Sequence, residues 1–437
     1  MLTSENHADP ELDCDVLIIG GGPAGSTAAA LLAEKGRDVV LLEKDQHPRF
    51  HIGESLLPQN LEIFERLGLL DEIAKIGVHK AGAEFVSDEH GKQVVFDFSN
   101  ALDQQYSYSF QVRRAEFDQL LFSNARSKGA RTYENTRVMD VEFKGDARSV
   151  VTARDSTGQD IEWRPRYVLD ASGRDTFLAT KYGSKEKNSR NTTAAIFGHF
   201  ENVPRRLGKY EGNITIHLFD HGWFWMIPLP GDVMSVGVVG HADFFKSRKT
   251  DRETFFFDAI AMCPSAAERM ANAKLVSPIT ATGNYSYQAK SMVGDSYLMI
   301  GDSFAFIDPV FSSGVMLAMA GATLGADVAD AWLDDPRRAV PLLKEFDKKV
   351  RRALDTLSWL IYRINTPVLR DMFMQPRDTL KMRQGLISLL AGNVHANAQR
   401  QFPVLAFKAA FYFLAAAYRL GYRLGPEGLK KAAVATA

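Results

Sequence analysis

The feature that most constrains the fold lies near the amino end of the chain, where an apolar stretch runs into a glycine-rich turn. Residues 15–19 (DVLII) predict a strand that is buried on both faces. The turn GGGPAG follows at residues 20–25, and residues 26–35 predict a helix that Gly36 ends. Residues 38–42 (DVVLL) predict the next strand. This β–turn–α–β unit indicates an α/β protein with a parallel sheet.

The glycines of this turn have the spacing of a dinucleotide-binding fingerprint. They follow the pattern Gly-x-Gly-x-x-Gly, and an acidic residue ends the second strand about 20 residues later. The glycines permit a close approach of backbone to a pyrophosphate, and the helix N-terminus offers N–H groups and a positive dipole. The acidic residue would bond the ribose hydroxyls. The predicted dinucleotide contacts in this unit are Gly20, Gly22, Pro23, Ala24, Gly25, Glu43 and Lys44.

The composition excludes several classes of protein. A chain of 437 residues that is 46% hydrophobic and 24% charged is long enough for two or three domains. Its formal net charge of −1 argues against a general nucleic-acid binder. Its two cysteines, Cys14 and Cys263, exclude a disulfide framework and a multi-cysteine metal site. They fit a reducing compartment, and residues 1–13 lack a secretory-signal pattern, so we expect a cytoplasmic protein without a metal ion.

The charge is unevenly distributed along the chain. Residues 361–437 carry 11 basic and 3 acidic residues, whereas residues 1–360 carry 41 and 50. The apolar run at residues 402–420 is interrupted by Lys408 and Arg419, so it predicts an amphipathic helix rather than a membrane span. The basic region is either a helical subdomain packed on the core or a contact surface for an anionic membrane or an acidic protein.

Three further segments indicate which dinucleotide is bound. Residues 298–302 (LMIGD) place an aspartate after a strand, residues 167–173 (YVLDASG) form a second acidic–glycine turn, and residues 111–118 (QVRRAEFD) place an arginine at a helix start. From about residue 13 to residue 335, the sequence resembles the FAD-dependent oxidoreductases that have the aromatic-hydroxylase, glutathione-reductase-type fold. The resemblance implies that FAD contacts Asp302 and either Arg114, which fits better, or the arginine before it.

The resemblance also implies the domain organisation. We expect an α/β chain with a Rossmann-like FAD-binding domain, an antiparallel-sheet substrate domain and a helical C-terminal subdomain. The expected FAD-binding domain covers residues 13–95, 110–190 and 280–335, the substrate domain residues 96–109 and 191–279, and the C-terminal subdomain residues 336–437.

Four motifs narrow the resemblance to the flavin-dependent halogenases. They are GES at residues 53–55, GWFWMIP at residues 222–228, FIDPVFSSG at residues 306–314 and GVHKAGAEF at residues 77–85. By resemblance, these motifs supply an active-site lysine, a tunnel wall that suppresses monooxygenation, and a halide site beside the flavin. The corresponding residues are the FAD contacts Ser55, Pro309 and Gly314, the halide ligands Ser313 and Gly314, the tunnel residues Trp223, Trp225 and Phe311, and the catalytic Lys80.

The resemblance implies a reaction. Reduced FAD and O2 give a flavin C4a-hydroperoxide, chloride or bromide attacks it, and the resulting hypohalous acid is relayed to Lys80 for substitution of an electron-rich aromatic. Backbone N–H groups at a helix N-terminus suit a halide ion, because the dipole favours an anion. No second nucleotide fingerprint is present, so we expect a separate flavin reductase to supply the reduced FAD.

One position departs from the tryptophan-specific halogenases. Those relatives carry a glutamate two residues before the halide-binding residue, and this chain has Phe311 there. The departure favours a phenol or a pyrrole, free or tethered to a carrier protein, over tryptophan. A basic C-terminal region would attract an acidic carrier over long range.

Other interpretations remain open at this stage. Lys80 is also compatible with a solvated surface lysine, Trp223 and Trp225 with core aromatics of a strand, and Ser313–Gly314 with an ordinary helix start. Similar FAD motifs occur in reductases of C=C bonds, such as geranylgeranyl reductases, and in aromatic monooxygenases. A non-enzymatic docking module that retains flavin binding is a third alternative.

Overall fold

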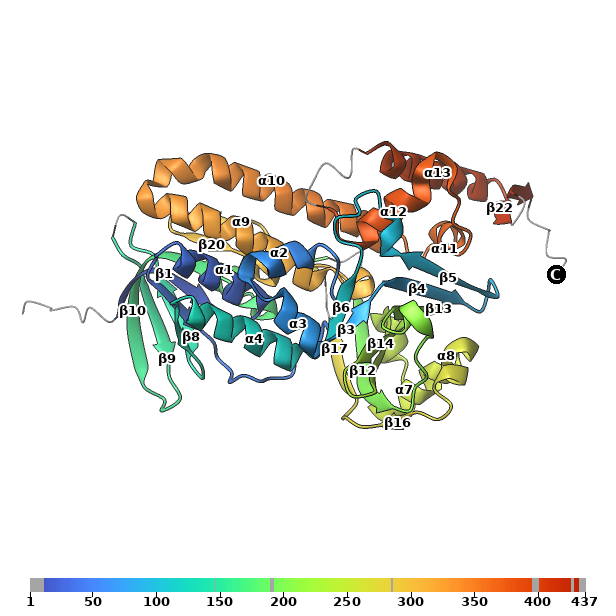
Figure 1. Ribbon diagram of the computed structural model, residues 1–437, viewed down its shortest axis with the longest axis horizontal. Helices are drawn as coiled ribbons and strands as arrows, with labels where there is room; N and C mark the ends of the chain where they lie inside the picture. Colours follow the sequence, from blue (N-terminus) through green and yellow to red (C-terminus); the bar gives the residue numbers. More distant parts are fainter. Residues whose placement is uncertain are drawn as a thin grey trace, which may run out of the picture.

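The computed structural model describes residues 12–145, 147–188, 192–283, 286–394, 401–425 and 428–431. The expectation about residues 1–11 therefore lies outside the described residues. Two eight-stranded sheets and a helical C-terminal region form the molecule, and Figure 1 shows the two sheets side by side along its long axis.

The first sheet is built around the predicted β–turn–α–β unit. Its strand order is β19-β20-β10-β1-β2-β7, with the β8–β9 hairpin continuing from β10. The central strands pair in parallel, as predicted. The strands are β1 (Asp13–Ile19), β2 (Val39–Leu42), β7 (Arg131–Tyr133), β8 (Arg137–Glu142), β9 (Val150–Arg154), β10 (Asp160–Asp170), β19 (Val293–Gly294) and β20 (Tyr297–Met299).

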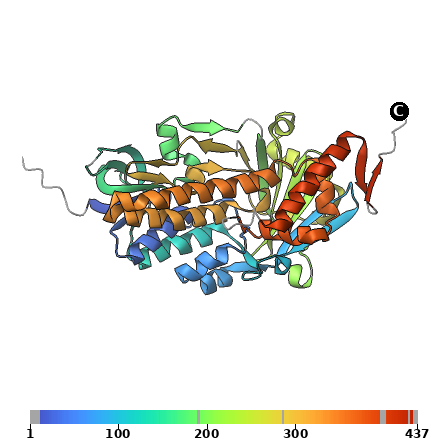
Figure 2. The same cartoon turned by 90° about the horizontal axis from the view of Figure 1, so that it is seen from above.

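Helices cover this sheet because each has an apolar face to bury. They are α1 (Pro23–Glu34), α4 (Arg114–Ser127), α5 (Phe177–Lys181), α9 (Gly314–Asp334) and α10 (Pro336–Ile361). Figure 2 shows α9 and α10 running side by side across the molecule. Of the described helices, only α9 has the length and mean hydropathy (1.2) that a membrane span needs, and 56% of that stretch is buried, as in a core helix.

Two short helices follow the loop after β2. Residues 60–76 form α2 (Asn60–Leu67) and α3 (Leu70–Ile76), because Gly68 adopts a left-handed conformation (φ 72°) that ends α2. A two-stranded ribbon follows, made of β3 (Gly77–Lys80) and β6 (Ser109–Val112). This ribbon lies between the two sheets (Figure 1).

The second sheet has the order β16-β12-β15-β14-β13-β4-β5, with β17 also pairing with β12. It is antiparallel apart from the parallel pair of β13 and β4. The strands are β4 (Gly82–Ser87), β5 (Lys92–Asp97), β12 (Thr193–Glu201), β13 (Ile214–Phe219), β14 (Gly222–Leu229), β15 (Val233–His241), β16 (Lys274–Leu275) and β17 (Thr280–Gly283). Helices α6 (Ala242–Lys246), α7 (Arg252–Ala261) and α8 (Pro264–Arg269) follow β15.

This sheet corrects the expected domain boundaries. Residues 82–95 and 280–283 were expected in the FAD-binding domain, but they pair into the second sheet as β4, β5 and β17. The physical reason is long-range pairing: β4 lies beside β13, more than 100 residues later in the chain, and no local pattern records that partner.

The structure also contains a small three-stranded sheet. It has the order β11-β18-β21 and consists of β11 (Lys185–Lys187), β18 (Tyr287–Ala289) and β21 (Ala305–Phe306). All its strand pairs are antiparallel.

The C-terminal region packs on the second sheet. Its helices are α11 (Pro367–Met374), α12 (Met382–Leu390) and α13 (Phe402–Arg419). Phe373 of α11 contacts the rings of Phe85 and Phe96, 5.0 and 5.4 Å away. The expected helical C-terminal subdomain is confirmed, except that β22 (Tyr422–Gly425) and β23 (Gly428–Lys431) form a hairpin after α13.

Candidate active site

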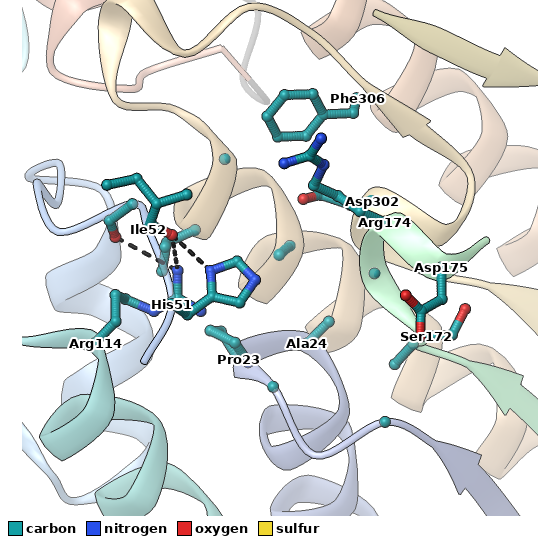
Figure 3. A pocket seen from close by; sticks show the side chains of 18 of the residues that line it. Pro23, Ala24, His51, Ile52, Arg114, Ser172, Arg174, Asp175, Asp302 and Phe306 are labelled. Atoms are coloured by element: carbon teal, nitrogen blue, oxygen red, sulfur yellow. Dashed lines mark hydrogen bonds between the residues drawn. The ribbon is translucent and has the colours of Figure 1, made fainter. Parts of the chain in front are cut away.

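A cavity of about 760 Å³ opens beside the glycine-rich turn. Its wall combines the turn, the loop at residues 43–55, the start of α4, residues 171–175 and residues 300–318 with one face of the second sheet. Figure 3 shows side chains from these segments converging on the cavity. A cavity of this size at the carboxyl ends of parallel strands is where α/β folds bind dinucleotides.

Two glycines of the turn have different physical roles. A Cβ on Gly25 would lie 1.9 Å from the Gly20 carbonyl oxygen, so Gly25 is needed for the turn to close. A Cβ on Gly22 would meet only the Arg49 guanidinium, 3.8 Å away, among the described residues. The space beside Gly22 therefore belongs to the cavity, as expected where a backbone must approach a pyrophosphate closely.

Glu43 is positioned differently from the expectation. Its Oε2 accepts a hydrogen bond from the Gly21 amide at 2.8 Å, and its Oε1 accepts one from the Asp45 amide at 2.9 Å. The side chain is buried and holds the turn, although it also lines the cavity. Its contact with a ribose stays a prediction. The next residue, Lys44, lines the cavity and pairs with Asp175.

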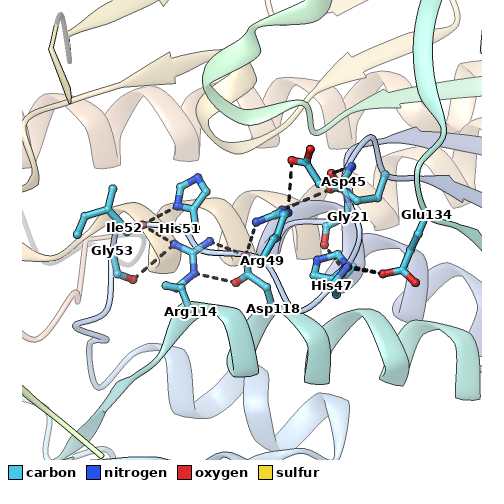
Figure 4. A network of polar contacts seen from close by, with 12 residues as sticks. Gly21, Asp45, His47, Arg49, His51, Ile52, Gly53, Arg114, Asp118 and Glu134 are labelled. Carbon is cyan, nitrogen blue, oxygen red and sulfur yellow. Dashed lines mark hydrogen bonds and ion pairs between the residues drawn. The ribbon is translucent and has the colours of Figure 1, made fainter. Parts of the chain in front are cut away.

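Arg114 begins α4 and lies at the cavity wall in a buried ionic network (Figure 4). Its Nε and one terminal nitrogen donate to the two oxygens of Asp118, at 2.7 and 2.9 Å, and its other terminal nitrogen donates to the Ile52 carbonyl at 2.9 Å. Arg49 donates to Asp118 at 3.2 Å. Burial raises the pKa of Asp118, but the positive charges of Arg114 and Arg49 outweigh burial and lower it overall.

The neighbouring arginine, Arg113, faces elsewhere. Its guanidinium donates to the carbonyl of Pro230 at 2.9 Å. Of the two arginines that the sequence offers as FAD contacts, Arg114 is therefore the one in the cavity wall.

Two aspartates hold the far side of the cavity. Asp302 lines it, and burial raises the pKa of its carboxyl to about 7, against the opposing charges of Arg114 and Arg174. Asp170 is buried behind the wall and accepts from the amides of Ser172 and Leu178, at 2.9 and 2.8 Å. Asp170 thus shapes the second glycine turn, while Asp302 faces the space that a ligand would fill.

The predicted halide turn lies at the start of α9. Asp308 caps a short 3-10 turn by accepting from the Val310 amide at 3.2 Å, and Ser312 adopts a left-handed conformation (φ 57°) just before the helix. Pro309 and Gly314 line the cavity, and Ser313 is almost fully buried. The first N–H groups of a 21-residue helix have no intrahelical partners, so this end can hold an anion.

Phe311 lies behind this turn. It is buried and stacks on Phe373 of α11, with ring centroids 6.1 Å apart. This contact connects the halide turn to the C-terminal helices. A tunnel role for Phe311 stays a prediction.

Lys80 is buried, with 1% of its surface exposed. Its ammonium donates to Ser55 Oγ and to the Leu56 carbonyl, both at 2.8 Å, and lies 5.4 Å from the centroid of the Phe98 ring. Ser55 in turn lines the cavity. Burial lowers the pKa of Lys80 to about 7. The alternative of a solvated surface lysine is therefore excluded.

The two tryptophans form part of the cavity wall. Trp223, Trp225 and Ile227 alternate along β14 and face the cavity, whereas Phe224 and Met226 point into a second core. Trp225 donates from its indole nitrogen to Ser235 Oγ at 3.1 Å, which fixes its ring. The two tryptophans therefore line the cavity and are also buried aromatic residues of a strand.

Comparisons with known proteins decide the family. The family model described as "FAD binding domain" matches residues 13–329. A 1H-pyrrole-2-carbonyl-[peptidyl-carrier protein] chlorinase of Pseudomonas fluorescens is 30% identical, over 88% of this chain and 90% of that protein. The chain belongs to the flavin-dependent halogenases.

Other relatives support this family. A tryptophan 2-halogenase of Chondromyces crocatus is 35% identical over 71% of this chain, and the match spans 60% of that longer relative. The myxobacterial chondrochloren halogenase CndH has a similar structure, with a TM-score of 0.77 and 30% identity over 96% of this chain and all of that one. A flavoprotein/dehydrogenase from Cytophaga hutchinsonii matches with a TM-score of 0.84 and 28% identity, over 92% and 99%.

The residues fit the FAD that this halogenase family uses. The open space beside Gly22, the N–H groups at the start of α1 and the Arg114 guanidinium suit a pyrophosphate and its ribityl chain. Burial raises the pKa of Asp302 to about 7, so both of its protonation states exist near neutral pH, and the carboxyl suits a hydroxyl partner because these states can accept or donate.

Sequence reasoning missed several residues of this site. Arg49 bridges Glu43 and Asp118, and His51 contacts the Ile52 carbonyl at 2.6 Å. His199 of β12 contacts Glu54 at 2.8 Å and so ties the second sheet to the cavity loop. The signal that could have found the loop residues is the density of titratable side chains at residues 47–54 (HPRFHIGE).

Proposed function

We propose that this protein is an FAD-dependent halogenase that uses reduced FAD, O2 and chloride or bromide to halogenate an electron-rich aromatic. The observation that carries the proposal is the position of Lys80. Lys80 has 1% of its surface exposed and is hydrogen-bonded to Ser55 on the cavity wall. Burial of an ammonium group costs desolvation free energy, so a buried lysine beside a cavity is a candidate for a catalytic role. When bound, reduced FAD supplies with O2 the oxidising power that turns a halide ion into hypohalous acid.

Residues of this chain bind the halide ion, orient the hypohalous acid and line the cavity wall. The amide groups at the start of α9 bind the halide ion, since the helix dipole favours an anion there. Lys80 in its ammonium form donates a hydrogen bond to the hypohalous acid and orients its halogen toward the aromatic ring. Trp223 and Trp225 close the cavity wall with apolar rings, which excludes the aromatic substrate and bulk water from the flavin side.

We further propose that the aromatic is a phenol or a pyrrole, presented free or as a thioester on an acidic carrier protein. Two relatives are named as pyrrole halogenases that act on a peptidyl-carrier protein. The position where tryptophan-specific members have a carboxylate is occupied here by Phe311, so help from a carboxylate base is not available there. We propose a cytoplasmic setting in which a separate flavin reductase supplies the reduced FAD.

The experiment combines the purified protein with FAD, a flavin reductase, NADH and either chloride or bromide. The substrates offered are a free phenol, free pyrrole-2-carboxylate, the same pyrrole on a carrier protein, and tryptophan. We expect a halogenated phenol or pyrrole by mass spectrometry, and a loss of at least about 100-fold in Lys80→Ala with FAD affinity unchanged. The control is Lys75→Ala, an exposed lysine on α3. Full activity in Lys80→Ala would show that Lys80 has no catalytic role.

A second candidate is a flavin-dependent dehydrogenase or reductase of C=C bonds. It is favoured by the similarity to the Cytophaga flavoprotein/dehydrogenase. Reduction of a substrate double bond in halide-free buffer, without any halogenated product in halide, would establish this candidate instead.

A further inference from the structure

A second hollow adjoins the FAD cavity on the side of the small three-stranded sheet. Its volume is about 420 Å³, and it shares His51 and Arg174 with the larger cavity. Its other lining residues include Lys185, Lys187 and Tyr287. The site described above uses none of these three side chains.

The register of the small sheet explains why cations gather here. Along β11, Lys185 and Lys187 share one face, while Glu186 points to the other face and pairs with Lys290. Lys187 lies opposite Tyr287 in the antiparallel pair, and Lys185 Nζ lies 4.0 Å from the centroid of the Tyr287 ring. One face of the sheet is therefore both basic and aromatic.

The larger cavity meets this face at Phe306. Phe306 lies opposite Tyr287 in β21 and lines the FAD cavity. The Arg174 guanidinium lies over the Phe306 ring, 5.7 Å from its centroid, and Figure 3 shows the two side chains together at the cavity edge. The basic face thus continues directly into the cavity wall.

Arg174, Lys185 and Lys187 bring three basic side chains to the lining of this hollow. The pKa of Lys185 is lowered, first by burial and then by the positive charges of Arg174 and Lys187, against the opposing charge of Asp175. Residues 1–360, which include all three of these residues, have a net charge of −9. A local cluster of cations attracts a diffusing anion over long range.

We propose that Arg174, Lys185 and Lys187 form a basic entrance rim that steers the anionic flavin dinucleotide into the cavity. FAD carries two phosphate charges, and attraction by a basic rim raises the rate of encounter more than the strength of the final complex. The inference rests on the proposed use of diffusible reduced FAD, because a cofactor that exchanges at each turnover benefits from fast association.

The test measures how fast FAD binds to the apoprotein, by stopped-flow quenching of flavin fluorescence. The double variant Lys185→Gln/Lys187→Gln is compared with wild type at about 20 mM and about 500 mM potassium acetate, a halide-free salt, where screening is weak and strong respectively. We expect an association rate constant about fivefold lower at low salt, no difference at high salt, and a dissociation rate constant within about twofold of wild type.

The matched control is Lys92→Gln/Lys249→Gln, which removes the same charge from exposed lysines of the second sheet and its neighbouring loop. An unchanged association rate constant, an equal loss in the control, or a loss that persists at high salt would overturn the proposal. An effect confined to dissociation would also overturn it, since the lysines would then be contacts of bound FAD. The measurement needs no halide or aromatic, so its outcome is independent of whether Lys80 supports halogenation.

Discussion

At the scale of single residues, Lys80 shows how burial tunes a side chain for its proposed task. An exposed lysine is an ammonium at all physiological pH values, whereas burial lowers the pKa of Lys80 to about 7. Its two hydrogen-bond acceptors, Ser55 Oγ and the Leu56 carbonyl, hold the nitrogen in place in either form. A nitrogen that exists in both forms near neutral pH can donate a hydrogen bond to hypohalous acid or accept a halogen from it.

This burial predicts a pH-dependent stability difference between wild type and Lys80→Met. Because the pKa is lowered on folding, the unfolded chain binds more protons than the folded one between about pH 7 and pH 10. The free energy of unfolding of the wild type therefore rises with pH across this window, and the burial penalty is complete below it. Lys80→Met lacks this titration, so its stability relative to wild type should be higher at about pH 6 than at about pH 10 by on the order of 4 kcal/mol.

Urea denaturation at about pH 6 and about pH 10 measures this difference. The advantage of Lys80→Met should shrink as the pH rises. A gap that is the same at both pH values would mean that Lys80 titrates as an ordinary lysine. The exposed lysine variant Lys75→Met serves as the control; because the hydrogen bond to Glu72 raises the pKa of Lys75, this variant should not show an advantage that shrinks as the pH rises.

At the scale of elements, the β–turn–α unit separates two kinds of glycine. Gly25 lies where helix α1 presses on the turn, and any side chain there would collide with the Gly20 carbonyl. Gly22 has ordinary extended backbone angles (φ −76°, ψ −171°) and open space beside it. Gly25 is therefore required by packing within the unit, whereas Gly22 is required only for binding a ligand.

The matched pair Gly22→Ala and Gly25→Ala tests this division. We expect Gly22→Ala to keep its melting temperature as apoprotein while its dissociation constant for FAD rises more than about tenfold, because a methyl group would displace the pyrophosphate. Gly25→Ala should lose about 3 kcal/mol of stability or fail to fold. Thermal unfolding and flavin fluorescence titration measure the two effects. Normal FAD affinity in Gly22→Ala would mean that this turn does not hold the pyrophosphate.

At the scale of the whole molecule, the C-terminal region is partly core and partly an uncovered apolar surface. Val404, Phe407 and Phe411 of α13 are buried, whereas another side of the same helix and the turn after it are exposed. The exposed apolar side chains are Phe402, Leu405, Tyr412, Phe413 and Leu420. Exposed basic residues such as Arg419 and Lys431 lie close to them in the chain. Exposed apolar side chains together with nearby exposed cations complement an acidic protein surface.

We therefore predict that charge reversal at this surface weakens the use of a carrier-bound substrate. Arg419→Glu/Lys431→Glu should raise KM for a carrier-tethered pyrrole at least about fivefold at low salt, because long-range attraction is lost, and should leave kcat for a free aromatic unchanged. Arg248→Glu/Lys249→Glu, beside α6, is the matched control. An unaltered KM would exclude the carrier, and loss of binding to phosphatidylserine vesicles instead would identify an anionic membrane as the partner.

Much of the FAD site could be predicted because its signals are local. Each of these elements (the turn, the first two strands and the helix start at Arg114) depends on residues that are close to one another in the sequence. The structure places the elements around one cavity. Glu43 could not be predicted fully, because its carboxylate is taken by the amides of Gly21 and Asp45 once the turn closes. Arg49 was missed since its partner Asp118 is 69 residues away in the chain.

The sequence by itself determined the dinucleotide fold and the alternation of Trp223 and Trp225 on one side of a strand, because these follow from spacing and periodicity. Only the tertiary structure decided that β4 and β5 join the second sheet, that Arg114 rather than Arg113 faces the cavity, and that Lys80 is buried against Ser55. The physical reason is that burial and ionic pairing depend on segments brought together by the fold. Spacing along the chain records local geometry, and it does not record which distant surface will cover a given side chain.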